Sequence, residues 1–537
     1  VQESPFFSMS RFTHDIIREL SPYLTESCIS RMVTTCKLLN EMFKKSLTEV
    51  TMRSKNPEKF CDYVGLLSMT TGDAGVLPGT PNDSSICYPP NLTSLKWNMN
   101  LRRKTIELPE SITELSIYDN GTDVEVYPEN IVSLEIDEIE TISLSRFKYL
   151  ESLKLNVLLY DFEFPSTLTS LSIKNGCDIF VDEWDSLPQG LTSFELGSSL
   201  STYCTDGLML KNLPKGLTNL KLMSSSWNFD PSDHMPVNLK SFFLYGEQTQ
   251  FDAKMLPRSL TSFITSQVTV VNHSYIPESV TYMDFDLANF AGKDVETMSK
   301  LSKLIPKGLR ELHVKILWTQ FTADHCHLQH LTSLNFRLFD AVMKPSLTSS
   351  LPITLTTLSG VKDFPGSFGY DFSHLVNLTT MKGVFSATTV FPPNLTDLKC
   401  EDRNCGYKFP TKLRTLNVQS ITVGCQDRCE MDPFQFEDIP QSVTHLSCYV
   451  LSFNDGTPVA TLPNIEKFEF GIIGNEEIED GGLSLIMKAF PNLQSLSGDG
   501  SRIEQRLDGR RYVMALNGGY GDLCWYEGSE LIKFINN

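Results

Sequence analysis

The residues best suited to metal chemistry are histidines and a cysteine in one short stretch. DHCHLQH at Asp324–His330 places His327 and His330 three residues apart, with His325 and Cys326 beside them. A helix or turn can bring two such ligands together, but zinc needs ligands that converge in a tetrahedron. No second Cys/His pair follows at the spacing of a zinc finger. The sequence therefore favours a surface loop here, and we expect no metal site.

Four further cysteines could supply thiolates to a metal: Cys400, Cys405, Cys425 and Cys429. Their irregular spacing, without flanking glycine turns, favours reduced structural cysteines over a zinc cluster. The chain has 13 cysteines in all, an odd number that shows no regular framework. This usage is typical of reduced thiols, so we expect a cytoplasmic or nuclear protein.

Motifs for catalysis and for cofactor binding are missing. The sequence contains no phosphate-binding loop, no dinucleotide-binding fingerprint and no nucleophile elbow, and its 65 acidic residues are dispersed. We therefore expect a protein that is not an enzyme and binds no cofactor. The formal charge of −19 argues against a nucleic-acid backbone or an anionic membrane as the main partner. No window approaches 18 consecutive apolar residues, so we expect no membrane span.

Six N-x-S/T sequons keep an extracellular location open. Three of them belong to a recurring phrase, NLT, in which asparagine precedes an apolar residue that we expect to be buried. The signal is therefore mostly a by-product of that phrase. The sequons begin at Asn82, Asn91, Asn120, Asn272, Asn377 and Asn394.

The recurring phrase is the main feature of the sequence. LPKGLTNLKL at Leu213–Leu222 returns with variations in nineteen copies, most of them 18 to 24 residues apart. We call the first apolar residue of each L-T-x-L phrase the register residue. The register residues are Leu92, Ile112, Ile131, Leu150, Leu168, Leu191, Leu217, Leu239, Leu260, Val280, Leu309, Leu331, Leu355, Leu378, Leu395, Leu413, Val443, Ile465 and Leu493.

Each copy predicts one short, half-buried strand. Leu217, Leu220 and Leu222 alternate with the polar Asn219 and Lys221, and a period of two is typical of a strand with one buried face. Fourteen copies have proline three residues before the register residue, a position just ahead of a strand where proline costs no ladder hydrogen bond. One short strand per 18 to 24 residues indicates a leucine-rich-repeat solenoid. We therefore predict an α/β repeat fold, a curved solenoid with one long parallel β-sheet.

The phrase P-x-x-L-T-x-L resembles two repeat families. It looks like the short, proline-marked repeats of bacterial LPX-type effectors. IPESVTYMDF at Ile276 and IPQSVTHLSC at Ile439 also resemble the FNIP repeats of amoebae and of large viruses of amoebae, although the Phe-Asn signature of that family is missing.

The N-terminal segment contains no copy of the phrase and reads as helical. Its apolar residues fall on one helical face, and a solenoid needs a cap at its end. The segment also resembles an F-box, in FTHDII, LSPYL and VTTCKLL. That resemblance implies that its apolar face binds the adaptor of an SCF-type ubiquitin ligase. The adaptor-binding residues would be Phe12, Ile16, Ile17 and Leu20.

We accordingly divide the chain into four parts. Residues 1–45 form the helical F-box-like unit or cap, 46–88 a degenerate first repeat or linker, 89–497 the solenoid and 498–537 a C-terminal cap. The concave face of the solenoid, with mixed charge and exposed aromatics, is the expected surface for protein partners. Its candidate residues are Tyr118, Lys174, Phe243, Tyr245, Lys315, Arg337 and Tyr449.

Two functions fit these features. In the first, the protein is the substrate receptor of an SCF-type ubiquitin ligase, with the F-box-like unit on the adaptor and the solenoid on a protein target. In the second, it is a non-enzymatic scaffold, structural or cell-surface interaction protein whose helices cap the solenoid.

Overall fold

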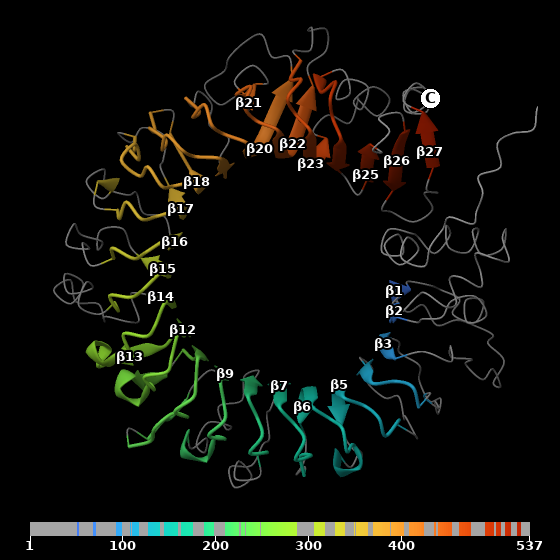
Figure 1. The fold of residues 1–537 in the computed structure, drawn as a ribbon, viewed down its shortest axis with the longest axis vertical. Coiled ribbons are helices and arrows are strands. Elements are labelled where there is room, and N and C mark those ends of the chain that lie inside the picture. Colours follow the sequence, from blue (N-terminus) through green and yellow to red (C-terminus); the bar gives the residue numbers. More distant parts are fainter. Residues whose placement is uncertain are drawn as a thin grey trace, which may run out of the picture. The chain divides into compact units, whose positions relative to one another are not determined.

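The computed structural model (Figure 1) consists of two compact units, Val1–Thr249 and Gln250–Asn537. We call them the first and the second unit. The structure describes residues 51–52, 68–70, 93–98, 108, 110–117, 127–139, 144–158, 163–175, 187–197, 210–224, 227–230, 232–247, 249–286, 305–316, 328–338, 348–349, 351–362, 369–386, 388–401, 408–423, 434–435, 439–453, 461–473, 489–498, 501–505, 511–516 and 524–527.

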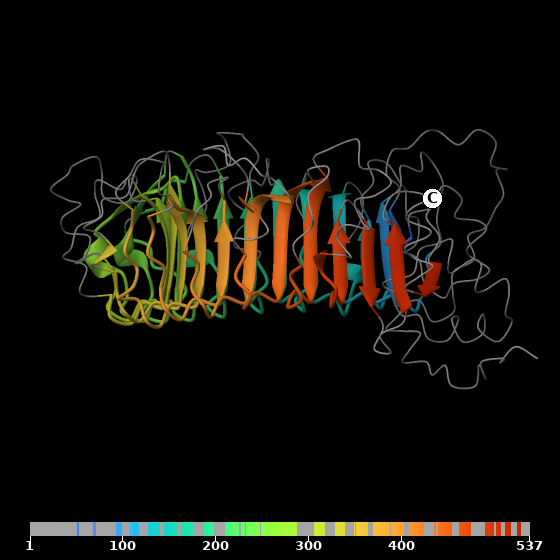
Figure 2. The same ribbon diagram turned by 90° about the horizontal axis from the view of Figure 1, so that it is seen from above.

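The first unit is a stack of parallel strands, each hydrogen-bonded to the next in chain order. Successive strands stand side by side (Figure 2). Its 3-10 helices are η4 (Leu144–Arg146) and η6 (Leu210–Asn212). Its strands are β1 (Thr51–Met52), β2 (Ser68–Thr70), β3 (Ser94–Asn98), β4 (Glu114–Ile117), β5 (Ser133–Ile139), β6 (Ser152–Leu158), β7 (Ser170–Asn175), β8 (Ser193–Gly197), β9 (Asn219–Met223) and β10 (Ser241–Tyr245).

The second unit repeats this parallel stack. Its main strands are β12 (Ser262–Ser266), β14 (Tyr282–Asp286), β15 (Glu311–Ile316), β16 (Ser333–Leu338), β17 (Thr357–Lys362), β18 (Thr380–Val384), β19 (Asp397–Cys400), β20 (Thr415–Val423), β22 (His445–Phe453), β23 (Lys467–Ile473) and β24 (Ser495–Gly498). The far end of β20 also pairs with β21 (Phe434–Gln435).

Smaller elements accompany the main stack of the second unit. Strands β11 (Gln250–Asp252) and β13 (Thr269–Val271) form a separate parallel pair. The 3-10 helices η7 (Ala253–Met255) and η8 (His273–Tyr275) follow them in turn. After β24 the pairing becomes antiparallel, through β25 (Ser501–Gln505), β26 (Arg511–Leu516) and β27 (Cys524–Glu527).

The predicted strand register is confirmed for every copy. Each of the nineteen register residues is followed two positions later by the first residue of a strand, from β3 after Leu92 to β24 after Leu493. The register residues from Ile112 onward are all buried, and Leu493 is the most exposed of them at 4%. Apolar side chains at the third residue after the register residue are buried as well, so the core is a continuous column of stacked ladders.

The proline of each copy heads a β-turn. The N–H of Leu217 donates to the carbonyl of Pro214 at 3.1 Å, and the N–H of Leu260 donates to that of Pro257 at 3.1 Å. Proline serves at the first position because only its carbonyl takes part in the turn. The turn then delivers the chain into its strand at the same point in every copy.

The threonine after the register residue joins one copy to the next. The carbonyl of Thr169 accepts from the N–H of Thr192 at 2.8 Å, from the N–H of Ser193 at 3.1 Å and from the Thr192 hydroxyl at 3.1 Å. The same hydroxyl bond to the preceding copy recurs along both units. The donors are Thr113, Thr169, Thr192, Thr218, Thr281, Thr332, Thr356, Thr379 and Thr396.

Asparagine before the register residue makes a second link between copies. The side-chain amide of Asn377 donates to the carbonyl of Ile353 at 3.0 Å, and that of Asn394 donates to Val376 at 2.7 Å. The NLT phrase therefore has a structural reason, because both its polar residues satisfy backbone carbonyls of the neighbouring copy. The sequons at Asn82, Asn91 and Asn120 lie outside the described residues.

Three expectations about the architecture need comment. The α/β assignment is wrong for the described repeats, whose named helical elements are 3-10 helices of three residues each. Copies of about 20 residues spend most of their length on a strand and a turn, which leaves little chain for an α-helix. The long parallel sheet is confirmed as a parallel solenoid within each unit, but its C-terminal end is antiparallel.

The helical F-box-like unit at residues 1–45 lies outside the described residues and stays a prediction. Thr51–Met52 and Ser68–Thr70 form short strands within the segment predicted as a degenerate repeat or linker. Among the residues that the structure describes, no helix is long and apolar enough to cross a membrane.

Candidate functional site

The strands present their polar side chains on one face, which we call the strand face. It consists of the second, fourth and sixth residues after each register residue. In each unit the strands line the inner side of the curve that the unit makes (Figure 1). Because neighbouring copies pair in register, side chains at equivalent positions form rows across the strands. In the first unit one such row is Glu135, Lys154, Ser172, Glu195, Lys221 and Phe243.

Charges alternate along this row and pair across strands. The ammonium of Lys221 lies 2.6 Å from the Glu195 carboxylate, and the Ser172 hydroxyl donates to the other oxygen of Glu195 at 3.0 Å. Lys174 reaches Glu135 at 3.7 Å. Burial acts to raise the pKa of Glu195, but the hydrogen bonds from Lys221 and Ser172 outweigh it and lower the pKa below its usual value. The Glu195 carboxylate is thus held ionised and in place.

An apolar patch ends this row. Phe243 lies opposite Lys221 and Tyr245 opposite Met223, and the side chains of Met223, Phe243 and Tyr245 are all partly exposed. The Lys221 ammonium lies 5.5 Å from the centre of the Phe243 ring, within cation–π range. We call Met223, Phe243 and Tyr245 the aromatic patch. Large apolar side chains on an outward strand position are the kind of surface that protein partners bury.

In the second unit, a histidine-centred cluster occupies the strand face of β14 and β15. His313 Nδ1 lies 3.3 Å from the Tyr282 hydroxyl oxygen and 3.8 Å from the Asp284 carboxylate. His313 Nε2 lies 3.1 Å from the Glu311 carboxylate, and the Tyr282 and His313 rings meet edge to face. Both ring nitrogens are therefore engaged, and Asp284 is buried although its neighbours are polar.

Comparisons with known proteins bear on the fold. The chain is similar to leucine-rich-repeat proteins. CroV588, a circular leucine-rich-repeat protein, is 16% identical with a TM-score of 0.38, over 81% of this chain and 72% of that one. YopM from Yersinia enterocolitica is 16% identical with a TM-score of 0.35, over 90% and 94%. The leucine-rich-repeat protein LegL7 from Legionella pneumophila is 16% identical with a TM-score of 0.25, over 51% and 85%. No family model and no curated protein matches the chain.

The residues predicted for the concave face lie as follows. Lys174, Phe243, Tyr245, Lys315 and Tyr449 all occupy the sixth or fourth position after a register residue, on the strand face. Lys315 pairs with Asp286 at 3.0 Å, and Tyr449 is 57% exposed.

Two of the predicted face residues are described in part or not at all. Arg337 lies in β16, in register with Lys315, and the structure describes its backbone alone. Tyr118 falls outside the described residues.

The candidate metal ligands do not form a site in the described part of the chain. Cys400 and Cys448 are free thiols in the core ladder, and burial raises the pKa of Cys448 to about 12. Such a thiol stays protonated and unreactive at neutral pH. Within the described ranges no group of three or more His, Cys, Asp or Glu could hold a metal ion. Outside them lie Cys405, Cys425, Cys429 and most of the stretch Asp324–His330.

Sequence reasoning missed Tyr282 as a functional candidate. Tyr282 stands at the second position after its register residue, where nine copies carry serine. Departure from the residue usual at a repeat position is the signal that could have found it. Repeat positions that are normally architectural stand out when a large aromatic replaces the small residue.

Proposed function

We propose that the protein is a non-enzymatic binding protein that holds a protein partner on its strand face, with the aromatic patch of the first unit as the main contact. The observation that supports this most directly is the partly exposed Phe243 beside Tyr245 and Met223. Within a row of paired charges, these side chains offer apolar area that a partner could bury. Aromatic residues and methionine are enriched at protein interfaces.

The charges around the patch suit specificity. Lys221 and Glu195 are paired and held by Ser172, so they present a fixed pattern instead of two mobile side chains. Fixed charges orient a partner and exclude partners of the wrong sign, even where they add little affinity. The apolar patch would then supply affinity and the neighbouring row would supply selection.

Replacing Phe243 by alanine tests this function. We expect proteins that copurify with the tagged chain from its native source to be lost at least about tenfold, because an anchor side chain commonly contributes about 2 kcal/mol. Quantitative mass spectrometry of the captured proteins measures the loss. The circular dichroism spectrum should stay unchanged, since Phe243 faces outward.

The matched control is Val237→Ala, which removes an apolar side chain that is 71% exposed and lies in a turn of the same unit. This variant should capture the same proteins as the natural chain. Equal capture by all three chains would remove the aromatic patch from the proposed binding surface.

A finer proposal concerns the N-terminal segment. We propose that residues 1–45 form an F-box and that the protein is the substrate receptor of an SCF-type ubiquitin ligase. This proposal is supported by the sequence pattern at Phe12, Ile16, Ile17 and Leu20. The alternative is a scaffold, structural or cell-surface protein in which the same segment caps the solenoid.

The double substitution Ile16→Asp and Ile17→Asp separates the two. For an F-box, adaptor pull-down should be abolished while the melting temperature stays nearly unchanged, because these residues would face the adaptor. Ser8→Asp with Ser10→Asp adds the same two charges nearby and should leave the pull-down intact. A cap would give the reverse: a lowered melting temperature and no adaptor recovered even with the natural sequence.

Location follows from the same reasoning. We propose a cytoplasmic or nuclear protein, supported by the scattered cysteines of the sequence and by the free thiols of Cys400 and Cys448.

A further inference from the structure

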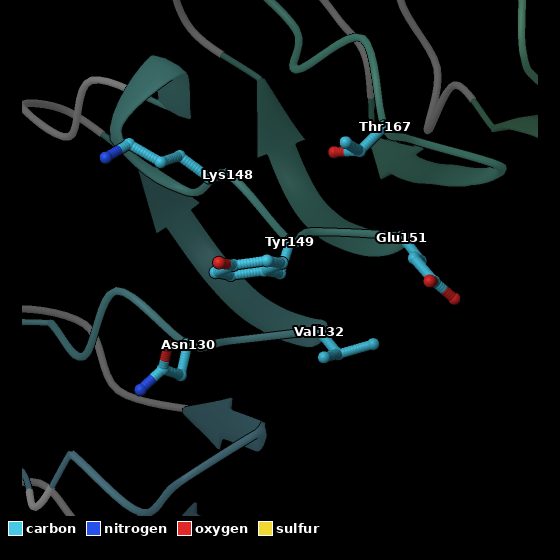
Figure 3. A pocket seen from close by; sticks show the side chains of 6 residues that line it. All are labelled: Asn130, Val132, Lys148, Tyr149, Glu151 and Thr167. Atoms are coloured by element: carbon cyan, nitrogen blue, oxygen red, sulfur yellow. The ribbon is translucent and has the colours of Figure 1, made fainter.

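A groove lies away from the strand face, on the turns of the first unit that precede β5, β6 and β7. It encloses about 330 Å³ and is lined by Asn130, Val132, Lys148, Tyr149, Glu151 and Thr167. Figure 3 shows the Tyr149 ring projecting across the centre of the groove, with Lys148 and Asn130 on either side of it and with Val132 and Glu151 at the other end. Its volume is at the lower end of the range for small binding pockets.

Tyr149 breaks the rule of its repeat position. Sixteen of the nineteen copies carry Asn, Ser, Thr or Gly just before the register residue. The neighbours on both sides link copies in the usual way: Asn130 donates to the Glu110 carbonyl at 3.4 Å and Thr167 to the Leu150 carbonyl at 2.7 Å. Tyr149 instead turns outward and is 59% exposed. Its ring therefore contributes little to the link between copies and stands open to solvent.

Charges beside the groove favour a cationic ligand. Glu110, Glu129 and Glu151 are exposed carboxylates on these successive turns, and Lys148 is the exposed cation among them, which leaves two net negative charges. A second cation, Arg146, is already engaged: it donates to the Tyr127 carbonyl at 2.9 Å. A basic group entering the groove would thus meet an aromatic face and an excess of carboxylates.

The chain itself shows what such a tyrosine accepts. Tyr275, a turn residue of the second unit, is 57% exposed, and the ammonium of Lys254 lies 5.2 Å from the centre of its ring. Tyr149 is exposed to the same degree. Within the described residues, however, no cation lies over its ring.

We propose that this groove binds a basic side chain of a partner protein, an arginine that stacks on Tyr149 and pairs with Glu151 or Glu129. The planar guanidinium can stack on an aromatic ring and donate to a carboxylate at once, which an ammonium does less well. The groove is a second binding site, separate from the aromatic patch, so the two can fail independently.

The test uses the full chain with 3-fluorotyrosine in place of Tyr149 and acetyl-(Arg)4-amide as the probe. Titration followed by fluorine NMR at physiological salt should give a saturable shift of this label. The same label in place of Tyr275 should not shift, because Lys254 already covers that ring. Glu129→Gln with Glu151→Gln should weaken the binding about fivefold, in keeping with exposed charge and cation–π contacts.

Two controls make the result decisive. Glu163→Gln with Glu466→Gln removes the same charge from carboxylates that do not line the groove and should leave the affinity unchanged. Acetyl-(Glu)4-amide tests whether Lys148 dominates the site instead. The proposal is overturned by the absence of a saturable shift, by equal weakening in the control variant, or by saturation with the acidic peptide.

Discussion

Replacing Leu220 by alanine is expected to lower the free energy of unfolding of the first unit by about 2–5 kcal/mol. Leu220 is 2% exposed and lies in register between Phe194 and Phe242 of the neighbouring strands. The substitution removes buried apolar atoms and leaves a cavity between two rings that can close it only partly. Urea unfolding followed by far-ultraviolet circular dichroism measures the change.

Lys221→Ala is the matched control, one residue further along the same strand. Lys221 faces outward, and in its pair with Glu195 the two side chains are 42% and 30% exposed. Surface pairs of this kind contribute little, so we expect a loss under about 0.5 kcal/mol. Similar losses for the two variants would mean that the assigned strand register is wrong.

Replacing Gly360 by alanine is expected to destabilise the second unit by about 2–4 kcal/mol. Gly360 has φ of +73° and lies where the pairing of β17 with β18 shifts register between Ser359 and Val361. A Cβ atom here would collide with the backbone carbonyl of Phe336 on the adjacent strand. Alanine therefore has to adopt a left-handed conformation and displace main chain that is fixed by the β-ladder. Thermal melting followed by circular dichroism should show an earlier transition.

Gly190→Ala provides the comparison. A Cβ at Gly190 would lie 3.6 Å from the carbonyl oxygens of Leu168 and Ser166, at ordinary contact distance. Its effect should stay within about 0.5 kcal/mol. Equal destabilisation at both glycines would show that close approach and backbone conformation do not control the cost.

Much of the fold was determined by the sequence itself. The alternation of Leu217, Leu220 and Leu222 with polar residues, and the proline ahead of them, predicted where each strand begins. Both signals are local: period two sets which face is buried, and proline is confined to the turn. Because copies stack in register, the sequence also placed Phe243 and Tyr245 on the strand face.

Tertiary structure decided which of these side chains meet. Glu195 and Lys221 are 26 residues apart, and Tyr282 and His313 are 31 apart; each pair meets because the intervening residues leave the sheet between one strand and the next. Lys174 passes over β6 to reach Glu135, a contact that depends on side-chain length and direction across three strands. The groove at Tyr149 arises from three successive turns together. Local patterns fix each copy, but contacts between copies depend on the distance and angle at which the copies stack, and only the folded chain sets those.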